Sequence, residues 1–177
     1  MAPRVPSAHD VAALIIQEQH TANRTVDKLQ LEKWLYLVLG AHYVMWGQKA
    51  FREPAAAFAR GPVIRNVEAT YRSIPTREIP APLGGRPERV PSNLVETVRL
   101  VLHHFGKWSG PDLETFTKQG GAPWTLTVQN RDIEGSLIET WFRRHGVDPA
   151  PRDRVSDSEL VDRLADGDEK ALAELLR

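Results

Sequence analysis

The segment from Val26 to Trp46 limits the fold of this chain more than any other. Its helical pattern leaves hardly any polar side after the first turn. The apolar residues that cover its faces are Leu29, Leu31, Trp34, Leu35, Leu37, Val38, Leu39, Ala41, Val44 and Met45. A helix that is apolar all round has to be buried on every side, and Gly47 directly after it suits a left-handed cap. The sequence therefore predicts a mainly α fold, a compact helical domain around a buried central helix at about 26–46.

Capping signals predict the helices around this central one. Ser7 with Asp10, and Asn93 with Glu96, have the spacing of a capping box. They are expected to open helices at about 10–20 and about 93–105, and Ser109 is expected to cap a short further helix. A last core helix is predicted to turn four large residues inward, and these are Leu137, Ile138, Trp141 and Phe142.

The chain is predicted to turn sharply at Gly61 and Pro62. The helical period disappears before this corner, which favours a short extended or two-stranded insert near 48–60. Glycine adopts backbone conformations that other residues resist, and proline suits the first position of a helix. We therefore expect a helix from Pro62 to about Ser73. The stretch 74–93 contains five prolines and a Gly-Gly pair, which predicts an exposed loop without regular structure.

The chain divides near residue 148. Residues 1–148 form the predicted helical domain, and residues 149–177 form a proline-containing linker and an acidic two-helix tail. From Arg152 to Arg177 there are five Lys or Arg against eight Asp or Glu, a net charge of −3. The rest of the chain holds 18 against 15, a net charge of +3.

Composition excludes several classes of function. The chain has no cysteine, which rules out disulfides, thiolate metal sites and a cysteine nucleophile. No apolar run approaches the roughly 20 residues that span a bilayer, and the N-terminus lacks an apolar signal core, so we expect a cytoplasmic protein without a membrane partner. The formal net charge of +0 does not favour nucleic acid as a partner.

The residue patterns predict no catalytic site, cofactor or metal. His103 and His104 are adjacent, and consecutive helical residues diverge too far to face one ion. The carboxylates Glu32, Glu53, Asp112 and Glu114 are interpreted as scattered, solvated positions. No glycine-rich spot has the spacing of a phosphate-binding loop. We therefore expect a protein that is not an enzyme.

A set of aromatic and basic residues stands out around the central helix and the Gly-Pro corner. Its members are Trp34, Tyr36, Trp46, Arg60, Arg65, Tyr71 and Arg72. Aromatic residues and arginine dominate the energetic centres of protein interfaces, although aromatic residues also fill cores. Arg60 and Arg65 favour the surface, because a core rejects an unpaired charge.

Four blocks of the sequence occur in an order that is known from one family. The first block contains Lys28, Leu29, Gln30, Leu31, Lys33, Leu35 and Tyr36. The second contains Phe58, Gly61, Pro62 and Val63, and the later stretch, with the last two blocks, contains Gly106, Leu113, Pro123 and Trp124. Together these blocks resemble the Panacea antitoxin domain, the SocA-like family of toxin–antitoxin systems. The resemblance covers about residues 27–145. It departs from the family where Phe58 replaces the usual tryptophan and where Glu32 interrupts a leucine-rich run.

The resemblance implies a mostly α-helical antitoxin of bacteria or phages that neutralises a neighbouring toxin by direct binding. Family members neutralise unrelated toxins, and at least one delivers its toxin to a protease, so a protease stays open as a second partner here. The toxin-binding residues that the resemblance and the aromatic and basic set together suggest are Lys28, Tyr36, Arg60, Gly61, Pro62, Val63, Arg65, Arg72 and Trp124.

The alternative is a transcription-linked adaptor or DNA-binding regulator. The tail "DSELVDRLADGDEKALAELLR" resembles the opening helices of sigma-factor region two, over about 20 residues and without the promoter-reading part. The mild positive charge of residues 1–151 is compatible with this alternative. Affinity that collapses with added salt would distinguish DNA binding from protein binding.

Overall fold

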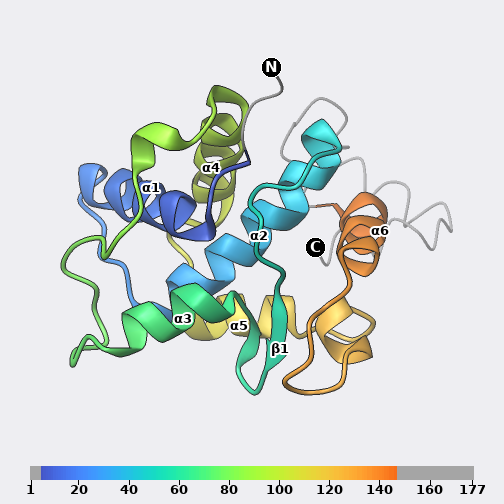
Figure 1. The fold of residues 1–177 in the computed structure, drawn as a ribbon. Coiled ribbons are helices and arrows are strands. Elements are labelled where there is room, and N and C mark those ends of the chain that lie inside the picture. Colours follow the sequence, from blue (N-terminus) through green and yellow to red (C-terminus); the bar gives the residue numbers. More distant parts are fainter. Residues whose placement is uncertain (1–4, 147–177) are drawn as a thin grey trace, which may run out of the picture.

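A computed structural model describes residues 5–146, and the predicted boundary at 148 and tail at 149–177 lie outside them. The described part is mainly helical, as the sequence predicts. Helix α2 (Lys28–Trp46) runs through its centre (Figure 1). Asp27 caps this helix, since its Oδ1 accepts the Gln30 N–H at 2.7 Å. Gly47 ends the helix in the left-handed conformation, with φ of 63°. Every residue from Leu31 to Tyr43 is buried, which confirms the buried central helix.

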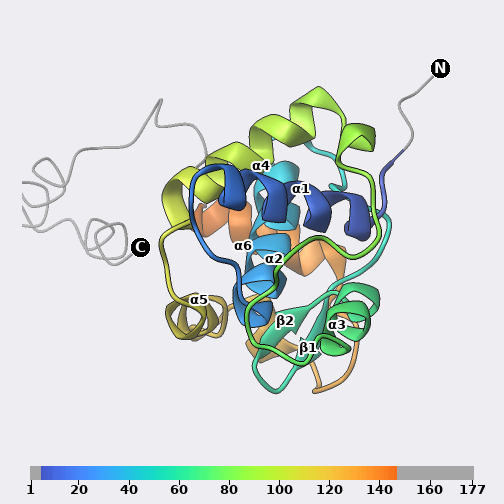
Figure 2. The same cartoon turned by 90° about the vertical axis from the view of Figure 1, so that its left-hand side faces the viewer.

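The other helices surround α2. Helices α1 (Ala8–Thr21) and α4 (Ser92–Phe105) pack on one side of it, and α6 (Gly135–His145) packs on the other (Figures 1 and 2). Helix α5 (Gly110–Thr117) lies beside the first turns of α2, where Gly110 approaches the Leu29 side chain. Within the described residues, no helix combines the length and the apolar character needed to cross a membrane.

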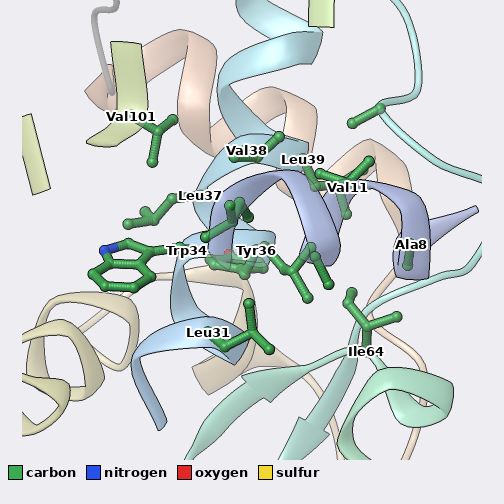
Figure 3. Close-up of a cluster of buried hydrophobic side chains, with 14 of the residues drawn as sticks. Ala8, Val11, Leu31, Trp34, Tyr36, Leu37, Val38, Leu39, Ile64 and Val101 are labelled. Carbon is green, nitrogen blue, oxygen red and sulfur yellow. The ribbon is translucent and has the colours of Figure 1, made fainter. Parts of the chain in front are cut away.

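The core forms where α2 meets α1 and α4. Figure 3 shows Trp34 and Leu37 of α2 on the side of Val101 from α4, and Leu39 of α2 on the side of Val11 from α1. The indole N–H of Trp34 donates to the Phe105 carbonyl at 3.1 Å, so this large side chain is buried without an unpaired polar atom. On the opposite side of the core, Phe142 of α6 packs edge-on against Tyr36, with ring centroids 5.5 Å apart.

A small hairpin follows α2. Strand β1 (Ala56–Phe58) pairs antiparallel with β2 (Gly61–Val63), and Ala57 lies opposite Pro62. The predicted two-stranded insert is therefore present, but it extends beyond residue 60. The predicted helix start at Pro62 is wrong, because helix α3 (Arg65–Arg72) begins three residues later. In a two-stranded sheet every strand is an edge, so the missing N–H of Pro62 is tolerated there.

Helix starts follow the predicted caps at two of three places. Ser7 caps α1 and Ser109 caps α5, each accepting a backbone N–H at 3.2 Å. The predicted cap at Asn93 is wrong. Helix α4 begins at Ser92 after Pro91, and the Asn93 amide donates instead to Gln48 Oε1 at 3.2 Å.

Two interpretations of burial also need correction. The segment 74–93 has only a short 3₁₀ turn (Pro87–Arg89) as regular structure, yet it is not simply an exposed loop. Ile79 and Val90 in this segment are buried, and the Ile79 N–H donates to the Val26 carbonyl at 2.8 Å. In α6, Ile138 and Phe142 are buried as predicted, whereas the predicted core residues Leu137 and Trp141 are half-buried. A second 3₁₀ turn (Pro123–Leu126) precedes α6.

His42 makes the α2–α4 contact sensitive to acid. Its Nδ1 atom lies 2.8 Å from Thr97 Oγ1, and burial lowers the pKa of His42 to about 4. Because the pKa of His42 is lower in the folded state than the unfolded value of 6.5, the neutral side chain stabilises the fold fully above pH 6.5. This stabilisation is lost as pH falls toward 4. We expect the wild type to lose about 2–3 kcal/mol relative to His42→Gln between these pH values, at about 1.4 kcal/mol per pKa unit.

Urea unfolding of both proteins across this pH range measures the difference, and other titrating groups cancel in it. Parallel stability curves for the wild type and His42→Gln would contradict the assigned role of His42.

Candidate partner-binding pocket

A pocket of about 320 Å³ opens between the first turns of α2, the β1–β2 hairpin and α3. We call it the corner pocket. Its apolar wall comes from all three elements: Leu29 from α2, Phe58 and Val63 from the hairpin, and Tyr71 from α3. Leu29 and Phe58 are half-buried, whereas Val63 and Tyr71 are buried. The hairpin therefore completes a cavity that neither helix could form alone.

Charged side chains surround the mouth of the corner pocket. Lys28, Arg60, Glu68 and Arg72 line it and are at least partly exposed. Arg60 pairs with Glu114 of α5, with Nη2 and Oε1 2.9 Å apart, and Arg72 Nε donates to Glu68 Oε1 at 3.0 Å. Ion pairs this exposed contribute little to stability. Both arginines can therefore exchange these partners for a ligand.

The floor of the pocket contains two buried ionisable groups that form hydrogen bonds to the backbone of residues 62 and 64. Glu32 Oε2 accepts the Ile64 N–H at 2.9 Å, and Lys33 Nζ donates to the Pro62 carbonyl at 2.8 Å. Glu32 is 6% exposed and Lys33 is 0% exposed. The interpretation of Glu32 as a solvated carboxylate is therefore wrong. Adjacent residues of α2 hold both sides of Val63, and this contact fixes the corner against the central helix.

Burial shifts both of these groups toward their neutral forms. It raises the pKa of the Glu32 carboxyl, and the Ile64 N–H and the charge of Lys33 offset only part of that rise. Burial likewise lowers the pKa of the Lys33 amine, against the charges of Glu32 and Glu114. Shifted carboxyl and amine groups in a pocket can indicate catalysis. Here each group already bonds to the backbone, which accounts for its position without any reaction.

Gly61 is required by the close approach of Lys33. Its φ is 105°, a conformation that L side chains rarely adopt, as the sequence predicts for this corner. A Cβ atom at this position would also lie 3.0 Å from Lys33 Cε and 3.2 Å from Thr117 Oγ1. The glycine therefore lets the hairpin turn lie directly on the buried lysine.

The structure brings four of the proposed toxin-binding residues together and separates the others. Lys28, Arg60, Val63 and Arg72 all line the corner pocket. Gly61 and Pro62 are buried in β2 beneath it, so they shape the surface without forming much of it.

Tyr36 does not belong to this surface. It is 1% exposed, it packs against Phe142, and its hydroxyl has no hydrogen-bond partner in the described part of the chain. The placement of Tyr36 in the binding site is therefore corrected to the core. Its large apolar ring is needed there to fill the space between α2 and α6.

Arg65 and Trp124 lie near the hairpin without lining the pocket. The Arg65 guanidinium lies 5.5 Å from the centre of the Phe58 ring, and Arg65 also pairs with Asp132 at 3.2 Å. The Trp124 indole N–H donates to the Phe58 carbonyl at 2.7 Å. Both side chains therefore hold Phe58, which forms part of the pocket wall.

Sequence reasoning missed the floor of the site and one residue at its mouth. Glu68 carries no motif signal, and its place beside Arg72 follows only from their i, i+4 spacing on α3. A signal for Glu32 and Lys33 was available, since two charged residues interrupt a helix that is otherwise buried all round. Such residues have to be buried with it and paired there.

Comparisons with protein-family models, curated proteins and solved structures find no match for this chain. Among residues 5–146, no group of three or more histidine, aspartate or glutamate side chains is arranged to hold a metal ion.

Proposed function

We propose that this protein is an antitoxin that neutralises a protein toxin by binding it directly, with the corner pocket at the centre of the contact. One observation carries the proposal. Four positions suggested for toxin binding, Lys28, Arg60, Val63 and Arg72, come from α2, the hairpin and α3 and converge on a single pocket. This convergence supports a shared role for them beyond packing, because two of the four are exposed arginines that the core does not need.

The chemistry of the pocket suits a protein partner. Protein interfaces concentrate their binding energy in a few apolar pockets that are surrounded by arginine and aromatic side chains. The corner pocket has an apolar wall that includes Phe58 and Tyr71, and Arg60 and Arg72 stand at its mouth. The proposal assigns binding to this pocket and no reaction. It names the product of the adjacent gene as the partner, and it leaves delivery of the toxin to a protease as a further possibility.

The first test is neutralisation. When the adjacent open reading frame is induced alone, growth should stop, and co-expression of this chain should restore growth and yield a complex that co-purifies. A harmless neighbouring gene, or rescue without any complex, would contradict the proposal.

Blocking the pocket tests its place in the contact. Ala59 is an exposed residue of the hairpin turn that lines the pocket, so Ala59→Trp should cover the opening without disturbing the core. We expect toxin affinity to fall by at least about tenfold, or about 1.4 kcal/mol, in a calorimetric titration. Ala69→Trp is the matched control, because Ala69 is exposed on α3 and does not line the pocket. Equal affinities for the two variants would place the contact elsewhere.

A further inference from the structure

The charges around the corner pocket are unbalanced in favour of cations. Lys28, Lys33, Arg60 and Arg72 line it, against two carboxylates, Glu32 and Glu68. Beyond the lining, Glu114 pairs with Arg60 and also with Lys118, at 3.2 Å, so this outer pair adds no net charge. The region as a whole therefore has a net charge of +2 with every group ionised, although the formal net charge of the chain is +0.

The carboxylates offset the cations at the mouth only in part. Glu32 is buried on the floor, where it bonds to the Ile64 N–H, and burial favours its neutral form. Glu68 accepts hydrogen bonds from both Nε and Nη2 of Arg72, which occupies its two oxygens. Arg60 keeps 64% of its side chain exposed and Arg72 keeps 68%. A partner that approaches the pocket therefore meets positive charge first and an apolar wall behind it.

We infer that the corner pocket receives an acidic segment of the partner protein, with an aspartate or glutamate next to an apolar side chain. This inference rests on the proposed function and names the chemistry of its partner. The carboxylate lies between Arg60 and Arg72, and the apolar neighbour contacts Leu29, Phe58 and Val63. A basic segment would meet repulsion from both arginines, and such like-charge contacts suppress wrong partners.

The positions of the two arginines support this assignment. They come from different elements, Arg60 from the hairpin turn and Arg72 from the last turn of α3, and both line one pocket of about 320 Å³. Arginine presents its N–H groups in a planar fork that matches a carboxylate with two parallel hydrogen bonds. Both forks contact carboxylates of this chain, Arg60 with Glu114 and Arg72 with Glu68, so the partner's carboxylate replaces one of these exposed contacts. A pocket of about 320 Å³ has room for side chains of a partner.

A photo-crosslinking residue at position 59 identifies the segment that enters the pocket. The full chain carrying benzoylphenylalanine in place of Ala59 is mixed with the product of the adjacent gene, irradiated and digested. We expect crosslinked peptides with an aspartate or glutamate within about two residues of a leucine, isoleucine, valine or aromatic residue. Crosslinked peptides that are basic, or that lack acidic residues, would overturn the inference while leaving the complex and the proposed function intact.

A double-mutant cycle then tests the carboxylate contact. We expect Arg60→Gln with Arg72→Gln to weaken toxin binding by at least tenfold, and the acid-to-amide change at the crosslinked partner residue to have no further effect in that background. Arg99→Gln is the matched control, because Arg99 is 65% exposed and pairs with Glu18 far from the pocket. Additive effects would overturn the inference, and absence of any complex would defeat both the inference and the proposed function.

Discussion

Gly40→Leu is expected to destabilise the protein by about 3 kcal/mol or more, because the centre of α2 leaves no room for a side chain there. A Cβ atom at Gly40 would lie only 2.3 Å from Cδ2 and 2.4 Å from Cε2 of Phe142. The ring of Phe142 is 0% exposed and packs against Tyr36 and Trp141, so it cannot move aside without disturbing the α2–α6 contact. Urea unfolding measures the loss.

A double variant that exchanges the side-chain sizes at positions 40 and 142 tests whether this close contact causes the loss of stability. Phe142→Ala alone should cost about 3–5 kcal/mol, as is usual for a buried phenylalanine. The double variant Gly40→Leu with Phe142→Ala should be more stable than the sum of the single effects predicts, because the leucine occupies space that the ring vacates. Gly120→Leu is the control, since nothing lies within 4 Å of a Cβ atom there. A loss for Gly40→Leu no larger than that of the control would contradict the close contact.

Glu32→Ala is expected to cost about 3 kcal/mol, whereas Glu32→Gln should cost less than about 1 kcal/mol. The alanine leaves the buried Ile64 N–H without an acceptor, and an unpaired buried donor is expensive. The glutamine retains an oxygen for Ile64 and introduces no charge. Thermal and urea unfolding of both variants at pH 7 measure the difference, and equal losses would contradict a hydrogen-bonding role for this side chain.

The pH dependence of stability in the wild type and in Glu32→Gln gives a second test. Because the folded-state pKa of Glu32 is raised, its contribution to stability is complete below the ordinary value of 4.5 and is lost as pH rises above it. The wild type should therefore lose stability relative to Glu32→Gln as pH rises from 4.5 toward neutrality. A constant difference between the two would show that the carboxyl titrates as it does in the unfolded chain.

These results would separate the parts of the corner pocket that hold it together from the parts that bind. Glu32 and Lys33 are buried and bond to the backbone of the hairpin, so changes in them should act on stability first. Arg60 and Arg72 are mostly exposed, so changes in them should act on partner affinity with little effect on folding. Stability measurements alone can thus show which variants act on structure, before the partner is known.

The central helix and several of its boundaries could be predicted because they depend on residues close together in the chain. The apolar pattern of residues 26–46 requires burial whatever surrounds it. Ser7 and Ser109 cap their helices through backbone groups three residues away, and Gly47 and Gly61 adopt positive φ as local turns demand. The caps and turns follow from preferences that act over one helical turn or less, and the burial of the central helix follows from its own apolar pattern.

Tertiary structure decided how the residues of the site come together and which of them are buried. Glu32 looks like an interruption of an apolar run, and only the distant Ile64 N–H explains why it is buried. Pro62 looks like a helix start, but its pairing with Ala57 and the bond from Lys33 keep it in a strand. The corner pocket joins side chains from residues 28 to 72, and Glu114 reaches Arg60 from α5. Contacts between such distant segments depend on how helices pack, and packing is not encoded in any local pattern.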